Sequence, residues 1–194
     1  MNDAKSPDRQ LTIRATEAAD LEAVLALYRA VAGRPGGLAR AADEITRPYV
    51  QDFLAHSRDR GLSLVAETRQ EGLADPAPAI VGASAIVGEI HAYGRGLRSF
   101  AHVLGDLTVA VHPQSQGRGV GRALFTRLLS EVEARFPAVM RVELLARESN
   151  AHAIALYESL GFRREGRLEA RVRGVNGELE ADIPMAWMRP GPAR

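Results

Sequence analysis

The stretch from Val109 to Phe125 reads Val-Ala-Val-His-Pro-Gln-Ser-Gln-Gly-Arg-Gly-Val-Gly-Arg-Ala-Leu-Phe. A short apolar run ends at Pro113, a loop of glutamine, arginine and glycine follows, and apolar residues then recur at helical spacing as far as Phe136. This pattern predicts a strand, a glycine loop and a helix in succession. The first N–H groups of a helix lack internal partners and carry partial positive charge, and glycines let a ligand approach the backbone. We therefore expect the loop to bind an anion such as a pyrophosphate.

Three kinds of glycine loop bind pyrophosphates, and spacing separates them. A dinucleotide fingerprint places its last glycine three positions after the second, whereas here Gly121 follows Gly119 by two positions. A P-loop requires Gly-Lys-Ser/Thr, and this loop has no lysine. The third pattern, Gln/Arg-x-x-Gly-x-Gly/Ala, is matched by the segment from Gln116 to Gly121. Taken alone, the segment is also compatible with a helix start that merely needs glycines.

A second informative segment follows about twenty residues later in the chain. An apolar run at 142–146 predicts a buried strand, and Ser149 or Asn150 is suited to cap the helix that begins after it. Within that helix, apolar residues from Ala153 to Leu160 share one face. Gly161 fits the left-handed position that ends many helices.

The two segments together resemble the coenzyme A-binding motifs of the GNAT superfamily of N-acetyltransferases. In that family the second motif carries Asn, Ala, Leu-Tyr and Gly-Phe, matched here by Asn150, Ala153, Leu156-Tyr157 and Gly161-Phe162. The resemblance implies an α/β GNAT fold (mixed α+β), with a central, mixed, mostly antiparallel twisted sheet of about six to seven strands and about four flanking helices. It also implies acetyl-CoA as the cosubstrate.

The order of predicted elements agrees with this fold. Residues 1–10 are expected to be a flexible tail, and residues 11–190 a single GNAT acetyltransferase domain. An Asn176-Gly177 turn between two strand-like runs is a strong hairpin signal. Strands are predicted at 11–15, 62–67, 79–89, 103–111, 142–146, 167–175 and 178–188. Helices are predicted after Asp20, at 42–58, at 120–136 and from 151, with a turn at 71–78 and an irregular stretch at 90–102.

Composition narrows the chemistry. The 194 residues include no cysteine, so disulfides, thiolate metal sites and a cysteine acyl-enzyme are excluded. Direct attack by the acceptor on the thioester, in a ternary complex, is the simplest mechanism that remains.

The formal net charge of +1 indicates no strong attraction to nucleic acids or membranes. No metal-ligand spacing is present, no apolar run is long enough to cross a membrane, and the start of the chain lacks a signal-peptide pattern. A cytoplasmic location is therefore expected.

The resemblance also assigns the cofactor-binding residues. The backbone of Val109, Ala110 and Val111 is expected to pair with the pantetheine amides as an added strand would, and one N–H to polarise the thioester carbonyl. Asn150 either hydrogen-bonds the pantetheine arm or only caps its helix. The loop residues expected around the pyrophosphate are Gln116, Gly117, Arg118, Gly119, Val120, Gly121 and Arg122.

For the catalytic roles the sequence leaves more alternatives open than for the cofactor-binding residues. Tyr157 is the candidate general acid that protonates the leaving thiolate, although an isolated tyrosine on such a helix more often fills core space. Glu89 or Asp106 is the candidate general base, and His91 and His102 lie in the same region. The stretch 90–102 either lines an acceptor site for an anionic small molecule, such as an amino acid, or forms an exposed hairpin tip.

These residues predict an N-acetyltransferase that modifies a primary amine, most simply on a small molecule. Two alternatives stay open: acetylation of a protein N-terminus or lysine, and a non-catalytic GNAT module that binds acetyl-CoA as a sensor. A homodimer is compatible with the final strands.

Overall fold

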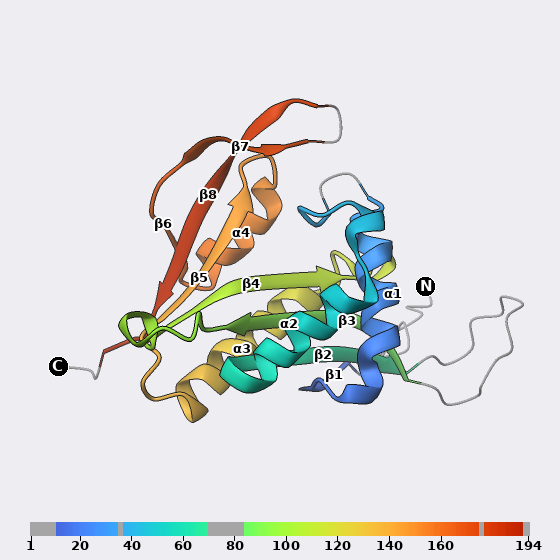
Figure 1. Cartoon of the computed structure of the whole chain (residues 1–194), viewed down its shortest axis with the longest axis horizontal. Helices are drawn as coiled ribbons and strands as arrows, with labels where there is room; N and C mark the ends of the chain where they lie inside the picture. Colours follow the sequence, from blue (N-terminus) through green and yellow to red (C-terminus); the bar gives the residue numbers. More distant parts are fainter. Residues whose placement is uncertain (1–10, 35–36, 70–83, 175–176, 192–194) are drawn as a thin grey trace, which may run out of the picture.

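The computed structural model describes residues 11–34, 37–69, 84–174 and 177–191. They form one eight-stranded sheet in the order β1-β2-β3-β4-β5-β8-β6, with β7 also paired to β8 (Figure 1). The strands are β1 (Leu11–Ala15), β2 (Gly61–Arg69), β3 (Ser84–Tyr93), β4 (Val103–Val111), β5 (Arg141–Arg147), β6 (Arg163–Arg164), β7 (Leu168–Arg173) and β8 (Leu179–Met188). The mixed, mostly antiparallel sheet is confirmed. It has one strand more than expected, because the two-residue β6 pairs with β8 without any recognisable strand pattern.

In the described part of the chain four α-helices cover the sheet, as predicted: α1 (Leu21–Ala32), α2 (Arg47–Arg60), α3 (Val120–Arg135) and α4 (Ala151–Ser159). Helices α1 and α2 lie on one face, where they build a core cluster around Tyr28 and Phe53. Helices α3 and α4 lie on the other face and build a larger cluster around Phe125 and Phe162. The two clusters meet at the central strands, so the sheet carries apolar residues on both faces there.

One helix start differs from the expectation, and the cap that the sequence suggests at Asp20 does not form. Helix α2 begins at Arg47 instead of residue 42, because Thr46 accepts a hydrogen bond from the Tyr49 N–H and Pro48 occupies the first turn, where its missing N–H costs nothing. Asp20 stands at the α1 N-cap position, but its carboxylate accepts from the Glu17 N–H and is not used to cap α1.

Strand β3 is longer at its end than predicted. Residues 90–93 continue the ladder with β2, in which Leu62 pairs with Ala92 and Gly61 with Tyr93, so the irregular stretch begins only after Tyr93. Glu89 therefore lies in the middle of the strand and not at its end. The predicted start at 79–83, the turn at 71–78 and part of the Asn176-Gly177 turn lie outside the described residues.

The sheet opens between its two halves. Strands β4 and β5 are its parallel neighbours, and their register contains two pairs, Val103 with Arg141 and Leu104 with Val142, in this described part of the chain. Just beyond, Asp106 adopts a left-handed backbone (φ 46°), and the pairing of β4 with β3 shifts register opposite it. Such a bulge bends a strand. Figure 1 shows β4 and β5 diverging along their length, and beyond their two register pairs one edge of β4 is left open towards the second half of the sheet.

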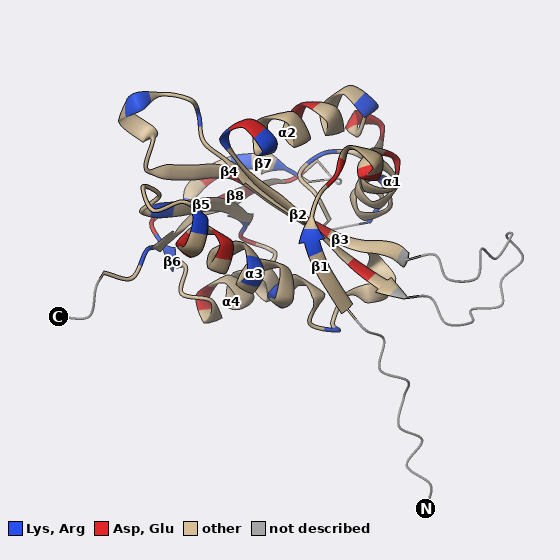
Figure 2. Ribbon diagram, turned by 90° about the horizontal axis from the view of Figure 1, so that it is seen from below, with Lys and Arg blue, Asp and Glu red and all other residues tan. Residues whose placement is uncertain are grey.

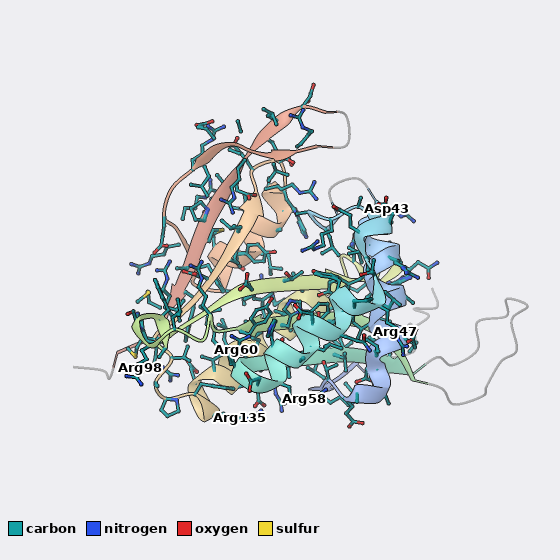
Figure 3. All side chains as sticks on the ribbon, viewed as in Figure 1. Asp43, Arg47, Arg58, Arg60, Arg98 and Arg135 are labelled. Carbon is teal, nitrogen blue, oxygen red and sulfur yellow. The ribbon has the colours of Figure 1, made fainter. Side chains whose placement is uncertain are left out.

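Charged residues of both signs occur on the helices and strands seen in one view of the ribbon. Figure 2 shows basic and acidic residues interspersed along the ribbons. Arg58, Arg60, Arg98 and Arg135, labelled in Figure 3, gather at the end of the sheet where β4 begins. Among the described residues, no helix is both long and apolar enough to cross a membrane.

Candidate active site

The glycine loop joins the open end of β4 to α3. Gly117 (φ 72°) and Gly119 (φ 80°) both have left-handed backbones, and no atom lies within 4 Å of where a Cβ would stand at either position. Gly119 is the α3 N-cap and supplies no side-chain cap, so the first N–H groups of α3 face a space kept free of side chains. The Gln116 side chain donates to the Val111 carbonyl over 3.0 Å and so fixes the loop to the strand end. This geometry suits a diphosphate.

A cavity of about 560 Å³ extends from this loop between β4, α3 and α4. It is lined by most of the residues expected to bind the cofactor, while Arg118 and the buried Ala110 lie outside the lining. Arg122 lines the cavity and donates to Ser159 Oγ over 2.8 Å. The Asn150 side chain accepts from the Ala153 N–H, so it caps α4, and the residue also lines the cavity. The lining residues expected from the sequence are Val109, Val111, Gln116, Gly117, Gly119, Val120, Gly121, Arg122 and Asn150.

The open edge of β4 presents backbone groups to this cavity. The His112 N–H donates to the Val87 carbonyl of β3 over 2.8 Å. Because successive residues of a strand direct their N–H and C=O groups to opposite sides, Val111 and Val109 direct theirs away from β3. Gln116 occupies the Val111 carbonyl, which leaves the Val109 groups facing the opening. An amide-bearing chain inserted there would extend the sheet.

A second cavity of about 690 Å³ lies on the acceptor side of the opening, between α2, β3, β4, β5 and β8. Five residues line both cavities: Gly37, Leu38, Val109, Asn150 and Tyr157. The two spaces therefore meet at the residues expected to border a thioester.

Tyr157 stands at this junction. Its ring, 9% exposed, packs against Phe125 and Phe162 with centroid distances of 5.0 Å and 6.1 Å. Among the described residues its hydroxyl has no hydrogen-bond partner. Burial raises the pKa of the Tyr157 phenol to about 12, so the group keeps its proton at neutral pH. Tyr157 thus has a packed ring, as a core tyrosine would, and it also lines both cavities.

The two candidate bases lie in opposite environments. Glu89 is 0% exposed, and its carboxylate accepts from Tyr28 and Ser63, so it makes no direct contact with a molecule in the second cavity. Asp106 is exposed and lines that cavity from the bulge in β4.

The stretch 90–102 lies only partly at the second cavity. His91, Tyr93 and Arg95 line the cavity, whereas Arg98 and His102 do not.

Several lining residues were not identified from the sequence. Tyr49 and Phe53 come from α2, and Arg40 comes from the segment before it. The Arg40 guanidinium lies over the Tyr49 ring, 4.2 Å from its centroid, and has no carboxylate partner among the described residues. Three other arginines of the wall are neutralised: Arg141 pairs with Glu143 and Glu165, Arg171 with Asp182, and Arg147 with Glu180. Arg95 lies over the Phe100 ring, 5.6 Å from its centroid, and like Arg40 has no carboxylate partner among the described residues. An apolar face on α2 gives no signal that distinguishes a cavity wall from core.

The sheet is open at its parallel pair, with a glycine loop at one end of the opening and two joined cavities. This is the arrangement expected of a protein that binds an extended diphosphate-bearing carrier beside an acceptor. The family model "Acetyltransferase (GNAT) domain" matches residues 61–164, and the chain belongs to this family. Acetyl-CoA is the cosubstrate of GNAT acetyltransferases. It is also present in the solved structure of yncA from Salmonella typhimurium, whose fold is similar (TM-score 0.75, 22% identity, covering 95% of this chain and 97% of that one).

The relatives of this chain are similar to it over different lengths. The alanine N-acetyltransferase of ribosomal protein bS18 from Escherichia coli K12 is 54% identical over 54 residues, 28% of this chain and 35% of that protein. The match thus spans about a third of these curated relatives. An acetyltransferase of Pectobacterium atrosepticum, ECA0875, is 29% identical over 158 residues, 78% of this chain and 87% of that protein. The crystal structure of a ribosomal-protein-alanine N-acetyltransferase from Brucella melitensis is 27% identical, with TM-score 0.72, and covers 91% of this chain and 99% of that one.

Proposed function

We propose that this protein is an acetyl-CoA-dependent N-acetyltransferase that acetylates the primary amine of a small molecule by direct attack. The observation that carries the proposal is the meeting of the two cavities at Tyr157 and Val109. A carrier held along β4 would place its thioester there, and an amine in the second cavity would face it. Such positioning is itself a large part of catalysis.

The residues then divide the chemistry among them. The α3 N-terminus and the glycine loop hold the diphosphate, and the Val109 backbone binds the pantetheine arm and polarises the carbonyl. Tyr157, protonated at neutral pH, gives its proton to the sulfur that leaves when the new C–N bond forms. Asp106 supplies negative charge at the wall of the second cavity, where the acceptor enters as an ammonium ion.

Arg40 narrows the class of acceptor. Like Arg95, it is a cation of this wall whose charge is not neutralised by a carboxylate among the described residues, whereas Arg141 and Arg171 are paired. Arginine binds carboxylates well. An acceptor with an amine near Asp106 and a carboxylate near Arg40, as in an amino acid, would satisfy both groups.

A protein N-terminus is the second candidate acceptor. It is favoured by the relatives whose names specify alanine of a ribosomal protein, among them the Brucella melitensis structure that this chain covers almost completely. The second cavity is also large enough to take the first residue of a peptide.

Thiol release from acetyl-CoA, measured with an acceptor panel, tests these alternatives. The panel contains amino acids, the same compounds as methyl esters, and short peptides that begin with alanine. We expect turnover with amino acids, a lower kcat/KM with the esters, and loss of that difference in Arg40→Ala but not in Arg95→Ala. Turnover with the peptides alone would replace the small-molecule proposal. Calorimetric binding of acetyl-CoA without thiol release from any acceptor would indicate a non-catalytic binding module.

A further inference from the structure

A buried polar cluster lies beneath the wall of the second cavity. Glu89 of β3 accepts hydrogen bonds from the hydroxyls of Tyr28 (2.5 Å) and Ser63 (2.7 Å), and His91 Nδ1 lies 3.2 Å from the same carboxylate. Ser63 is in turn bonded to Thr16 over 2.6 Å. A carboxylate without any exposed surface is costly unless donors compensate it, and here three donors surround it. A cluster of this kind specifies one arrangement of its members.

Hydrogen-bond geometry fixes where the protons lie. The Tyr28 hydroxyl is closest to Glu89, so its single proton is used there. Burial, and then the charge of Glu89, raises the pKa of Tyr28 well above its ordinary value, which keeps this donor protonated. His91 Nδ1 lies 3.2–3.3 Å from both Glu89 oxygens and 3.3 Å from the Tyr28 oxygen. If Nδ1 carried no proton, its lone pair would face these oxygens. Nδ1 therefore carries a proton, and in the neutral form of the ring Nε2 carries the free lone pair.

The same ring forms part of the cavity wall. His91 is 2% exposed and lines the second cavity beside Tyr93 and Thr108. Its ring stacks on Phe53 at a centroid distance of 4.1 Å and an interplanar angle of 17°, so packing as well as the Glu89 bond holds its orientation. Nε2, on the ring edge opposite Nδ1, has no hydrogen-bond partner among the described residues. It is the one nitrogen of the pair that can face an acceptor, directly or through one water.

We propose that His91 is the general base of the reaction and that Glu89 is a positioning residue that holds its tautomer; this inference rests on the proposed acetyl transfer. His91 Nε2 takes one proton from the acceptor ammonium, which frees the nitrogen lone pair to form the C–N bond. The C–S bond then breaks, and Tyr157 supplies the proton to sulfur. The nitrogen loses its remaining excess proton to the Tyr157 oxygen, and His91 returns its proton to solvent, so that one proton is released per turnover.

The charged and titratable groups around His91 are few. Glu89 and Tyr93 share its strand, Tyr28 faces it from α1, and Tyr49 lies on the adjoining part of α2. Asp106 and Arg40 lie on the same cavity wall. In this arrangement Asp106 attracts the ammonium ion and His91 removes its proton, so the two cavity-facing groups have separate roles.

The tautomer can be measured without turnover. In protein labelled with 15N-histidine, long-range 1H–15N correlations of the folded chain are expected to show His91 with a protonated Nδ1 and an unprotonated Nε2, assigned from the signals missing in His91→Asn. Glu89→Gln, which can donate to Nδ1, is expected to shift the proton towards Nε2. Ser63→Ala removes a donor from the same carboxylate without contacting His91 and should leave the tautomer unchanged. A proton on Nε2 in the wild-type protein would overturn the inference.

Kinetics separate a base from a merely structural histidine. His91→Asn is expected to lower kcat/KM for a basic amine about 100-fold, with the dissociation constant of acetyl-CoA unchanged. With a weakly basic acceptor of similar shape, already unprotonated at the assay pH, the deficit should shrink to about fivefold. Equal losses with both acceptors, or rates within threefold of wild type, would overturn the role of His91. Absence of thiol release by the wild-type protein with every acceptor would instead contradict the proposed function. In that case the NMR measurement would still test the inference about His91, because a proton on Nε2 would overturn it without any measurement of turnover.

Discussion

Arg147 Nη2 donates to the Gly37 carbonyl over 3.0 Å, a bond that joins the end of β5 to the segment between α1 and α2. The same nitrogen also donates to the Leu38 carbonyl. Gly37 and Leu38 line both cavities, so Arg147 holds the part of the chain that covers the junction where transfer is proposed. We therefore expect Arg147 to influence the proposed cosubstrate side and the proposed acceptor side of the site together.

Arg147→Ala should therefore weaken binding of both substrates. Removing the side chain leaves two carbonyls without their donor, at about 1–3 kcal/mol for the pair, and frees the covering segment. We expect KM to rise for acetyl-CoA and for the acceptor together, by about tenfold each, which corresponds to about 1.4 kcal/mol. Arg127→Ala, which removes an exposed α3 arginine paired with Glu131, is the matched control and should change neither KM. A rise in only one KM would show that the segment does not couple the two sides.

Tyr157→Phe is expected to lower kcat about 100-fold and leave the dissociation constant of acetyl-CoA unchanged, because the ring packing is kept and only the proton donor is lost. The raised pKa of about 12 adds a pH expectation. The acid form persists through pH 10, so wild-type kcat should not fall on the alkaline side below that value. Single-turnover thiol release and calorimetry measure the two quantities. Tyr93→Phe, which changes another tyrosine that lines the second cavity, is the control. If Tyr157→Phe keeps its kcat and instead binds acetyl-CoA more weakly, Tyr157 is not the general acid.

Local patterns were sufficient for much of the fold. The limits of β4, the start of α3 at Val120, the Asn150 cap and the left-handed Gly161 (φ 92°) follow from short-range chemistry and are confirmed. Each depends on residues within one turn or one strand, where spacing alone fixes the conformation.

The remaining features depend on contacts that a single segment does not encode. Glu89 and Asp106 look alike in sequence, yet one is enclosed by Tyr28 and Ser63 from distant elements and the other is exposed by a bulge. The positive φ of Asp106 could not be predicted, because glycine is the residue that ordinarily indicates a left-handed backbone and this position holds an aspartate. Arg147 acts through a carbonyl more than one hundred positions away in the chain.

An ion-pair cluster at the start of the chain predicts acid sensitivity. Arg14 bonds Asp20 and Glu67, and its guanidinium, together with the Glu17 N–H, holds the pKa of Asp20 below its ordinary value. A carboxyl whose pKa is lower in the folded state than in the unfolded state stabilises the fold above the unfolded value. That contribution is lost as the pH falls through the folded value.

Asp20→Asn should therefore cost about 1–3 kcal/mol of unfolding free energy at pH 7 and flatten the decline of that free energy as the pH falls below about 4. Urea titrations at several pH values measure both effects. Asp43→Asn, an exposed acidic residue outside this cluster, serves as the control. A parallel pH dependence in wild type and Asp20→Asn would show that other carboxyls govern acid unfolding.

The glycine loop offers a comparison in which backbone strain is held constant. Gly119 (φ 80°) and Gly177 (φ 81°) have the same left-handed backbone and the same empty space around a Cβ, but only Gly119 lies at the start of α3. Replacing either by alanine should cost about 1 kcal/mol of stability. Gly119→Asp adds a negative charge where the diphosphate is proposed to bind and should weaken acetyl-CoA binding at least about 100-fold, whereas Gly177→Asp should leave it unchanged. Calorimetry on the folded variants measures both. Equal affinities in the two aspartate variants would remove the loop from the cosubstrate site, and with it the placement of the thioester at Val109 and Tyr157.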